Sequence, residues 1–216
     1  MPDNRSIAAM RKEYQLKSLV KKDVDSDPLK QFDNWWQEAI HHGVNEPNAM
    51  TLATCSAAGK PSARIVLLKG VTPNGFVFFT NYESRKAHEL AEVSFAALVF
   101  FWKEHERQIR IEGKVRKVSE KESDEYFSVR PRESQLGAWS SPQSKVIESY
   151  ELLQENMKKY YDQFNGQPVP RPSFWGGFIV VPNLIEFWQG KPGRLHDRLQ
   201  YSLDENNNWI IQRLAP

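Results

Sequence analysis

Two hydrophobic periods alternate along the chain and predict helices and strands in different segments. Apolar residues recur three or four positions apart between residues 29 and 40 and again between 146 and 157, which predicts helices near 28–42 and over 144–164. From Ala49 onward, runs of β-branched and aromatic residues separated by turn residues predict strands instead. The predicted strands cover residues 50–55, 62–71, 76–81, 95–102, 108–118, 178–181, 185–188, 194–201 and 209–214.

Short motifs mark where helices begin and where the chain turns. Asp27 precedes a proline, which offers a capping side chain and a suitable residue for the first helical turn. Ser84 can cap a short helix over 84–90, and Ser119 with the glutamate three positions later forms a capping-box pattern. Residues 165–172 are rich in proline and predict a loop.

The order of the predicted elements favours a mainly β fold with a few peripheral helices. Most strands follow one another through hairpins, whereas a parallel sheet would need crossover helices, so the pattern favours a small closed antiparallel barrel. The pattern alone fits a β-sandwich as well. At 216 residues the chain fits one domain over 27–216, preceded by a polar, flexible arm over 1–26 that we expect to order on ligand binding.

Composition excludes several classes of protein. The 29 basic and 27 acidic residues leave a net charge of +2, too small for the large positive field of a nonspecific nucleic-acid binder. A single cysteine, Cys55, excludes an intramolecular disulfide framework and agrees with a reducing compartment. No apolar run is long enough for a signal sequence or a membrane span, so we expect a soluble cytoplasmic protein.

The most informative polar residues are Arg194, His196 and Arg198. Strand spacing would place all three on one face, where two guanidinium groups flanking an imidazole suit an anionic ligand. A solvated edge strand is the competing interpretation and would be preferred for the triplet alone. The chain has neither a Gly-x-Gly-x-x-Gly fingerprint nor a phosphate-binding loop, so any phosphate must be held by side chains.

Several further motifs, in a shared order and spacing, resemble one enzyme family along nearly the whole chain. They are RKEY (11–14), RIVLLK (64–69), SRKAH (84–88), ERQ (106–108), YFSVRPR (126–132), SQLGAW (134–139), PSFWGG (172–177), FWQGKPGRLHDR (187–198) and RLAP (213–216). The chain resembles pyridoxine (pyridoxamine) 5′-phosphate oxidase. The resemblance implies an FMN-binding split barrel, a small antiparallel barrel of Greek-key type, and a homodimer with FMN between its subunits.

The resemblance also implies which residues surround FMN. Arg64, Arg85 and Lys86 can neutralise its phosphate, although a solvated first helical turn is the competing interpretation for the last two. Phe79 departs from the tyrosine that is frequent in the family, which removes a hydroxyl contact. The implied FMN-binding residues are Arg64, Ile65, Val66, Leu67, Leu68, Lys69, Phe79, Thr80, Arg85, Lys86, Gln108, Gln143, Ser144, Trp188 and Arg198. Gln143 and Ser144 are expected to serve the site formed mainly by the partner chain.

A second group of residues is implied for the substrate. Strand alternation places Arg64 and Lys69 on opposite faces unless the strand twists, bulges or ends, and the resemblance assigns Lys69 to the substrate phosphate. Arg194 and His196 are the candidates for assisting catalysis beside the pyridine ring, and residues 11–14 are expected to form a lid. The implied substrate-binding residues are Arg11, Lys12, Glu13, Tyr14, Lys69, Tyr126, Arg130, Ser134, Arg194, Leu195 and His196.

The implied reaction oxidises pyridoxamine 5′-phosphate or pyridoxine 5′-phosphate to pyridoxal 5′-phosphate, with O2 as electron acceptor and H2O2 as product. Ammonia is released as well when the amine is the substrate. Another split-barrel flavin oxidoreductase and a noncatalytic FMN or pyridoxal phosphate carrier are the alternatives. A nucleic-acid-binding barrel, suggested by basic and aromatic residues over 101–116, is disfavoured by the low net charge. No metal ion, nucleic acid or membrane is expected as a partner.

Overall fold

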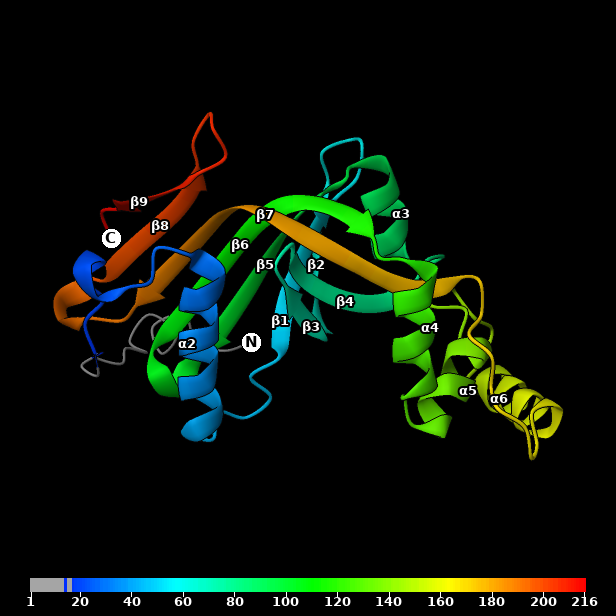
Figure 1. Ribbon diagram of the computed structural model, residues 1–216. Helices are drawn as coiled ribbons and strands as arrows, with labels where there is room; N and C mark the ends of the chain where they lie inside the picture. Colours follow the sequence, from blue (N-terminus) through cyan, green and yellow to red (C-terminus); the bar gives the residue numbers. More distant parts are fainter. Residues whose placement is uncertain (1–13, 15–16) are drawn as a thin grey trace, which may run out of the picture. The chain divides into compact units, whose positions relative to one another are not determined.

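The computed structural model describes Tyr14 and residues 17–216 and contains a mainly antiparallel β fold with peripheral helices (Figure 1). Its strands are β1 (Ala49–Cys55), β2 (Pro61–Leu67), β3 (Gly70–Thr72), β4 (Gly75–Asn81), β5 (Phe95–Trp102), β6 (Arg107–Lys117), β7 (Trp175–Gln189), β8 (Asp197–Leu203) and β9 (Trp209–Arg213). Its helices are α2 (Pro28–His41), α3 (Arg85–Glu92), α4 (Glu120–Ser128), α5 (Arg132–Ser140) and α6 (Glu151–Gln163), with short 3₁₀ turns at Lys21–Asp23, Lys103–His105 and Pro192–Arg194. The strand order is β2-β1-β5-β6-β7-β4-β3, with β8 paired to β7 and β9 paired to β8.

Local capping explains where two predicted helices begin. The side chain of Asp27 accepts a hydrogen bond of 2.8 Å from the backbone of Leu29, and Pro28 opens α2. Ser119 and Glu122 form a complete capping box at the start of α4. Ser84 precedes α3, but its side chain makes no capping hydrogen bond. The predicted caps at Asp27 and Ser119 are therefore confirmed.

The chain divides into two compact units, which are described separately. Among the described residues, one unit contains Tyr14 and residues 17–47, 99–111 and 184–216, and the other contains residues 48–98 and 112–183. Strands β5, β6 and β7 contribute residues to both units. The single domain over 27–216 stays a prediction.

The first unit has an aromatic core. Phe32 and Trp35 of α2 pack edge to face on Phe100 and Phe187, respectively, with ring centroids 5.4 and 5.1 Å apart. Tyr201 is fully buried and donates a hydrogen bond of 2.7 Å to the carbonyl of Asp25, and burial raises the pKa of its phenol. Part of the predicted arm, residues 17–26, therefore contributes contacts to this unit. The flexibility predicted for residues 1–26 stays a prediction.

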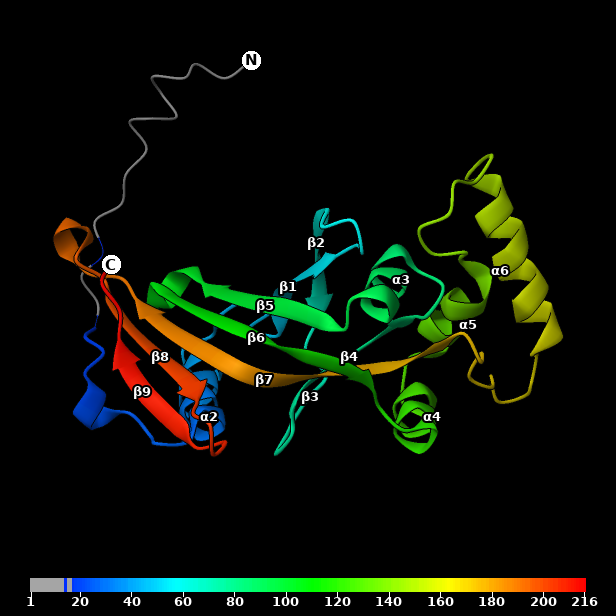
Figure 2. The same cartoon turned by 90° about the horizontal axis from the view of Figure 1, so that it is seen from above.

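The second unit contains the helices that follow β6 and the hairpin of β1 and β2. Phe127, Leu136, Phe164 and Trp175 form a buried cluster between α4, α5 and α6. Helices α5 and α6 lie side by side (Figure 2). In the hairpin, antiparallel register places Thr54 opposite Ser62 and Leu52 opposite Arg64.

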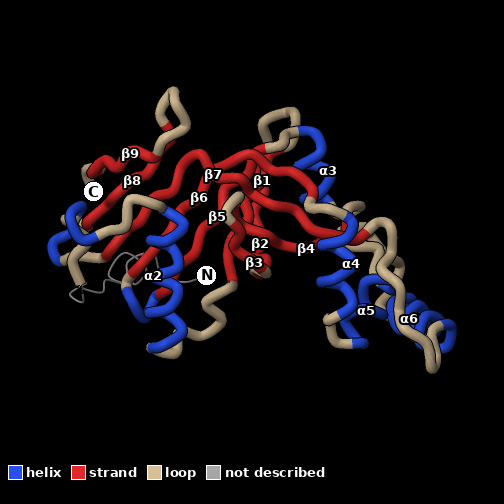
Figure 3. Tube along the Cα trace, in the orientation of Figure 1, coloured by secondary structure: helices blue, strands red, loops and turns tan. Residues whose placement is uncertain are grey.

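Several predicted boundaries are wrong, and each error has a local cause (Figure 3). The predicted strand over 62–71 is two strands, because β2 ends at Leu67 and β3 begins at Gly70. The predicted strand over 194–201 begins only at Asp197, since Arg194 has a positive φ of 62° and ends a 3₁₀ turn. The helix predicted over 144–164 begins at Glu151, since Ser144 has a φ of 72°, which a right-handed helix excludes.

Two further differences concern elements rather than boundaries. The segments predicted as strands 178–181 and 185–188 form the single strand β7. The part of β7 that pairs with β4 ends at Val180, and the part that pairs with β8 begins at Leu184. Pro182 lies between these two parts. Its missing N–H therefore costs neither of these ladders a hydrogen bond. Helix α5 was not predicted at all.

Candidate functional site

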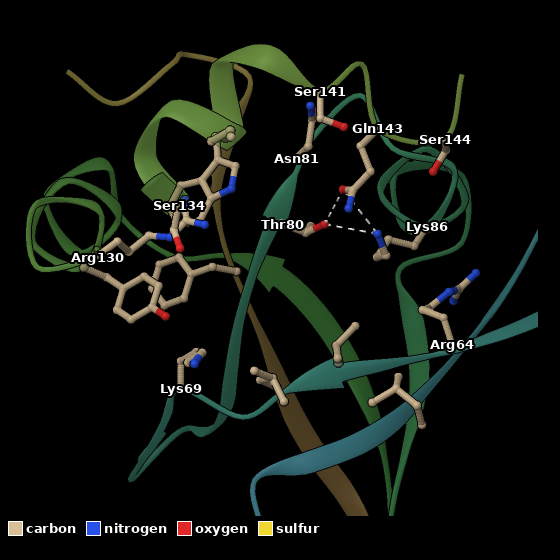
Figure 4. A pocket seen from close by; sticks show the side chains of 18 of the residues that line it. Arg64, Lys69, Thr80, Asn81, Lys86, Arg130, Ser134, Ser141, Gln143 and Ser144 are labelled. Atoms are coloured by element: carbon tan, nitrogen blue, oxygen red, sulfur yellow. Dashed lines mark hydrogen bonds between the residues drawn. The ribbon is translucent and has the colours of Figure 1, made fainter. Parts of the chain in front are cut away.

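A cavity of about 1110 Å³ opens in the second unit (Figure 4). Strands β2 and β4, helices α3, α4 and α5, and the loop after α5 supply its walls. Its lining includes these predicted site residues: Arg64, Ile65, Val66, Leu67, Lys69, Phe79, Thr80, Arg85, Lys86, Tyr126, Arg130, Ser134, Gln143 and Ser144. Leu68 is buried and is not part of the lining.

The end of β2 explains how Arg64 and Lys69 reach the same cavity. The strand stops at Leu67, and the backbone N–H of Lys69 then bonds to the carbonyl of Val77 on β4. The alternation of side chains between the two faces of the strand therefore no longer applies at Lys69. The sequence left three possibilities open, a twist, a bulge or an end of the strand, and the structure shows that the strand ends.

The first group of cations comprises Arg64, Arg85 and Lys86. Glu89 lies 3.3 Å from Nη2 of Arg64 and 2.8 Å from Nε of Arg85. Among the described residues, Lys86 has no carboxylate within ion-pair distance. Three positive charges less one negative charge leave this group at +2.

Lys86 is held by neutral groups. Its Nζ donates hydrogen bonds of 3.2 Å to Thr80 Oγ1 and 3.4 Å to Gln143 Oε1, drawn as dashed lines in Figure 4. A third bond of 3.4 Å reaches Ser84 Oγ. The residue is 8% exposed, and burial together with the charge of Arg64 lowers the pKa of its ammonium group. A solvated first helical turn therefore describes Arg85 but not Lys86.

The second group of cations comprises Lys69 and Arg130, with Tyr126 and Ser134 beside them. Figure 4 shows Lys69, Arg130 and Ser134 on one side of the cavity and Arg64, Lys86 and Gln143 on the other. Nη1 of Arg130 is buried and has no hydrogen-bond partner among the described residues, and burial lowers the pKa of this guanidinium. Helix α4 ends at Ser128, so Arg130 lies in the loop beyond the helix that carries Tyr126.

Stacked aromatic rings form one wall of the cavity. Phe79 stacks on Tyr126 with a centroid distance of 4.0 Å and on Trp175 at 5.5 Å. The guanidinium of Arg130 lies over Trp175, 4.5 Å from the ring centroid. Gly177 leaves space for the ring of Phe79, because a Cβ there would come within 2.7 Å of it.

The other predicted site residues that the structure describes belong to the first unit. Trp188, His196 and Tyr14 are neighbours, with ring centroids of Trp188 and His196 4.6 Å apart and those of Tyr14 and Trp188 5.7 Å apart. The backbone N–H of Lys191 donates to Nδ1 of His196 at 3.1 Å, so the neutral imidazole carries its proton on Nε2.

Two arginines in this unit differ in their surroundings. Arg198 forms a bidentate ion pair with Glu186, at 2.7 and 3.1 Å, whereas Arg194 is exposed. The shared strand face predicted for Arg194, His196 and Arg198 is wrong, because β8 begins only at Asp197 and the first two residues lie before it. Leu195 is exposed and Gln108 lies half-buried on β6. Arg11, Lys12 and Glu13 lie outside the described residues.

Comparisons with known proteins decide the family. Residues 36–164 match the family model described as pyridoxamine 5′-phosphate oxidase, and residues 175–216 match the pyridoxine 5′-phosphate oxidase C-terminal dimerisation region. The chain belongs to the pyridoxamine 5′-phosphate oxidase family. The predicted family and enzyme class are thus confirmed, and the family depends on FMN, as predicted.

Individual relatives agree with this family. The chain is 54% identical to the pyridoxine/pyridoxamine 5′-phosphate oxidase of Trichormus variabilis, over 99% of this chain and 100% of the relative. It is also 54% identical to the enzyme of the same name from Paraburkholderia phytofirmans, over 98% of this chain and 99% of the relative.

Solved structures confirm the split-barrel fold. PhzG from Burkholderia lata, in complex with tetrahydrophenazine-1-carboxylic acid, has a TM-score of 0.88 and 30% identity and covers 94% of this chain and 100% of its own. A pyridoxamine 5′-phosphate oxidase-related FMN-binding protein from Nostoc punctiforme has a TM-score of 0.69 and 14% identity, covering 86% of this chain and 97% of its own. This second likeness concerns the fold alone.

The comparisons and the structure also bear on the expected homodimer and on a possible membrane span. The match to a dimerisation region over 175–216 supports the predicted homodimer. Gln143 and Ser144 line the same cavity as Lys86 within one chain, so their presence there does not depend on a partner chain. Within the described part of the chain, no helix is both long and apolar enough to cross a membrane.

Sequence reasoning missed four residues of the site. Glu89, Thr54 and Ser62 surround Arg64, and Trp175 lies under Arg130. Glu89 follows Arg85 by four positions on α3, a spacing that the sequence does show. The other three become visible only once strand register and helix packing are known.

Proposed function

We propose that this protein is an FMN-dependent oxidase that converts pyridoxamine 5′-phosphate and pyridoxine 5′-phosphate to pyridoxal 5′-phosphate. The observation that carries the proposal is the presence of two separate cation groups in one cavity, because cofactor and substrate each carry a phosphate. A flavoenzyme with an unphosphorylated substrate would need only one such group. The cavity is also large enough, at about 1110 Å³, to exceed the usual size of a single small-ligand pocket.

The first cation group fits the phosphate of FMN. A phosphate monoester carries about −1.5 to −2 charges at neutral pH, which matches the net charge of +2 on Arg64, Arg85, Lys86 and Glu89. Lys86 has only neutral partners and therefore has its charge available for an anion. Hydroxyl groups in the lining, together with the apolar side chains along β2, complete a site for a phosphate attached to a flat ring system.

The second cation group fits the substrate phosphate. Lys69, Tyr126, Arg130 and Ser134 present two cations and two hydroxyl groups to the cavity. The buried Nη1 of Arg130 lacks a hydrogen-bond partner among the described residues, and a phosphate oxygen would supply one. The guanidinium of Arg130 lies over Trp175 and forms no ion pair with a carboxylate in the described part of the chain, so no anion there competes with the ligand.

Arg194 and His196 are proposed to act on the substrate ring, in a homodimer that binds FMN at the subunit interface. Because Lys191 occupies Nδ1, His196 can hold or move a proton only at Nε2. Gln108, Trp188 and Arg198 are proposed to contact FMN, and residues 11–14 to cover the substrate. We also propose a cytoplasmic location.

FMN, which Arg64, Arg85 and Lys86 would hold by its phosphate, would supply the redox chemistry, with the exocyclic carbon of the substrate as hydride donor and O2 as the final electron acceptor. The amine reaction consumes one O2 and one water and yields pyridoxal 5′-phosphate, NH3 and H2O2, whereas the alcohol reaction consumes one O2 and yields pyridoxal 5′-phosphate and H2O2. The protein binds both phosphates, orients the two rings and places His196 for proton movement. Orientation is the main contribution expected of these side chains.

An aerobic assay tests this proposal. Purified protein with FMN and pyridoxamine 5′-phosphate should produce aldehyde and H2O2 in equal amounts, and unphosphorylated pyridoxamine should react far more slowly. FMN binding without either product would instead favour a carrier. Oxidation of phosphate-free substrates at an equal rate would favour a different flavin oxidoreductase.

A further inference from the structure

Glu89 is a buried carboxylate beside Arg64 and Arg85 of the proposed FMN site, and the proposed function counts its charge but gives it no other role. The residue is 5% exposed and lies on α3. Its Oε2 accepts hydrogen bonds from Thr54 Oγ1 at 2.5 Å and Ser62 Oγ at 2.6 Å. Oε1 accepts a bond of 2.8 Å from Arg85. A buried charge with this many donors is strongly fixed in place.

The same hydroxyl groups also bind Arg64. Its Nη1 donates to Thr54 Oγ1 at 2.5 Å and to the carbonyl of Leu52 at 3.1 Å, while Nη2 donates to Ser62 Oγ at 2.5 Å and to Glu89 at 3.3 Å. A guanidinium can only donate, an ionised carboxylate can only accept, and a hydroxyl has one hydrogen and two lone pairs. Thr54 and Ser62 therefore donate their hydrogens to Glu89 and accept from Arg64 on a lone pair. The carboxylate thus determines the direction of both hydroxyl groups.

We propose that Glu89 is a positioning residue for the cofactor phosphate, which fixes the guanidinium of Arg64 directly and through the hydroxyl groups of Thr54 and Ser62. This inference rests on the proposed FMN site and deepens it. It assigns a role to three residues that do not themselves have to touch the ligand.

The strength of these bonds supports the proposal. Burial alone would raise the pKa of Glu89, but hydrogen bonds from Ser62, Thr54, Arg85 and Arg64 lower it to about 2. The carboxylate is therefore ionised at any pH where the enzyme would work. A hairpin needs no such cluster, because an apolar pair at the facing positions 54 and 62 would hold the strands equally well.

The test compares FMN with riboflavin, which has the same ring system but no phosphate. Dissociation constants would be measured by flavin fluorescence for the wild type, Glu89→Gln, Arg64→Ala and the double variant. Glu89→Gln should weaken FMN binding about tenfold or more, which corresponds to the loss of a charge-assisted contact, and leave riboflavin binding within about twofold. In the Arg64→Ala background the same change should alter FMN binding by less than about twofold, because Glu89 acts through Arg64.

Glu92→Gln is the matched control, since Glu92 lies one turn further along α3 and is exposed. If Glu89→Gln fails to fold, Thr54→Val is a second variant, which removes one of the two hydroxyl groups that connect Glu89 to Arg64. Equal losses for FMN and riboflavin, additive effects with Arg64→Ala, or unchanged FMN binding would each overturn the inference. If the wild type itself does not bind FMN, the proposed function fails instead, so the two failures are distinguishable.

Discussion

Replacing Lys86 with methionine separates the two roles of a buried cation, ligand binding and protein stability. Methionine has a similar length and fills the same space without a charge. In the folded protein Lys86 is 8% exposed, and its ammonium group is surrounded by neutral oxygen atoms and the like charge of Arg64. The substitution should therefore weaken FMN binding without lowering the stability of the FMN-free protein.

The size of the effect follows from simple electrostatics. Two unit charges about 4 Å apart interact by about 4 kcal/mol at an effective dielectric constant of about 20, and a hydrogen bond to a charged group contributes about 1.5–3 kcal/mol. We therefore expect a loss of about 2–4 kcal/mol, which corresponds to an FMN dissociation constant roughly 30-fold to 1000-fold higher. The free energy of unfolding of the FMN-free protein should stay the same or rise, because a buried cation without a carboxylate partner is removed.

The pH dependence has a defined sign. Burial lowers the pKa of Lys86 below its ordinary value, so the ammonium charge is lost at a lower pH than in an exposed lysine. FMN binding should weaken as pH rises through this lowered pKa. Between the lowered pKa and the ordinary one, the unfolded chain binds more protons than the folded protein, so stability of the FMN-free protein rises with pH there.

The assay is a fluorescence titration with FMN and riboflavin, combined with chemical unfolding of the FMN-free protein across alkaline pH. Lys86→Met should lose FMN affinity, retain riboflavin affinity and lose the alkaline rise in stability. An unchanged FMN dissociation constant would refute the reasoning. Equal weakening of both ligands would refute it as well, because the charge would then not act on the phosphate.

The remaining predictions concern the substrate, the catalytic candidates and the core. Arg130→Met should raise the KM for pyridoxamine 5′-phosphate about tenfold or more in steady-state assays while FMN titrations remain unchanged, and weakened FMN binding would contradict its assignment to the substrate. Arg194→Ala should reduce substrate turnover with FMN still bound, whereas loss of FMN alone would show that its role is misplaced. Gly113→Ala should destabilise the fold by at least about 2 kcal/mol in urea unfolding, since a Cβ there would lie 2.7 Å from the backbone carbon of Val181 and overlap its carbonyl oxygen; a midpoint equal to the wild type would contradict this packing.

Local sequence signals were sufficient for much of the fold. The apolar run over 95–102 gave the bounds of β5, and Asp27 and Ser119 identified the starts of α2 and α4. These elements are determined by residues close together in the sequence. The predicted starts of the helix over 144–164 and of the strand over 194–201 are wrong because of backbone conformation at single residues. Ser144 and Arg194 have a positive φ, which the sequence pattern did not indicate.

The same division between predictable and unpredictable features holds for the residues of the candidate site. The family resemblance identified Arg64, Lys69, Lys86 and Arg130, and the structure shows that all four line one cavity. Their partners were not predictable, because Glu89 meets Arg64 only through the packing of α3 against the β1–β2 hairpin. The pairing of Arg198 with Glu186 likewise depends on the register of β7 and β8.

A crystal structure of the protein with FMN and pyridoxal 5′-phosphate would show which cation group binds each phosphate. We expect the FMN phosphate to lie within hydrogen-bond distance of Arg64 and Lys86, and the phosphate of pyridoxal 5′-phosphate to lie within hydrogen-bond distance of Lys69 and Arg130. A structure with both phosphates at one cation group, with the two exchanged, or with either ligand outside this cavity would contradict this expectation.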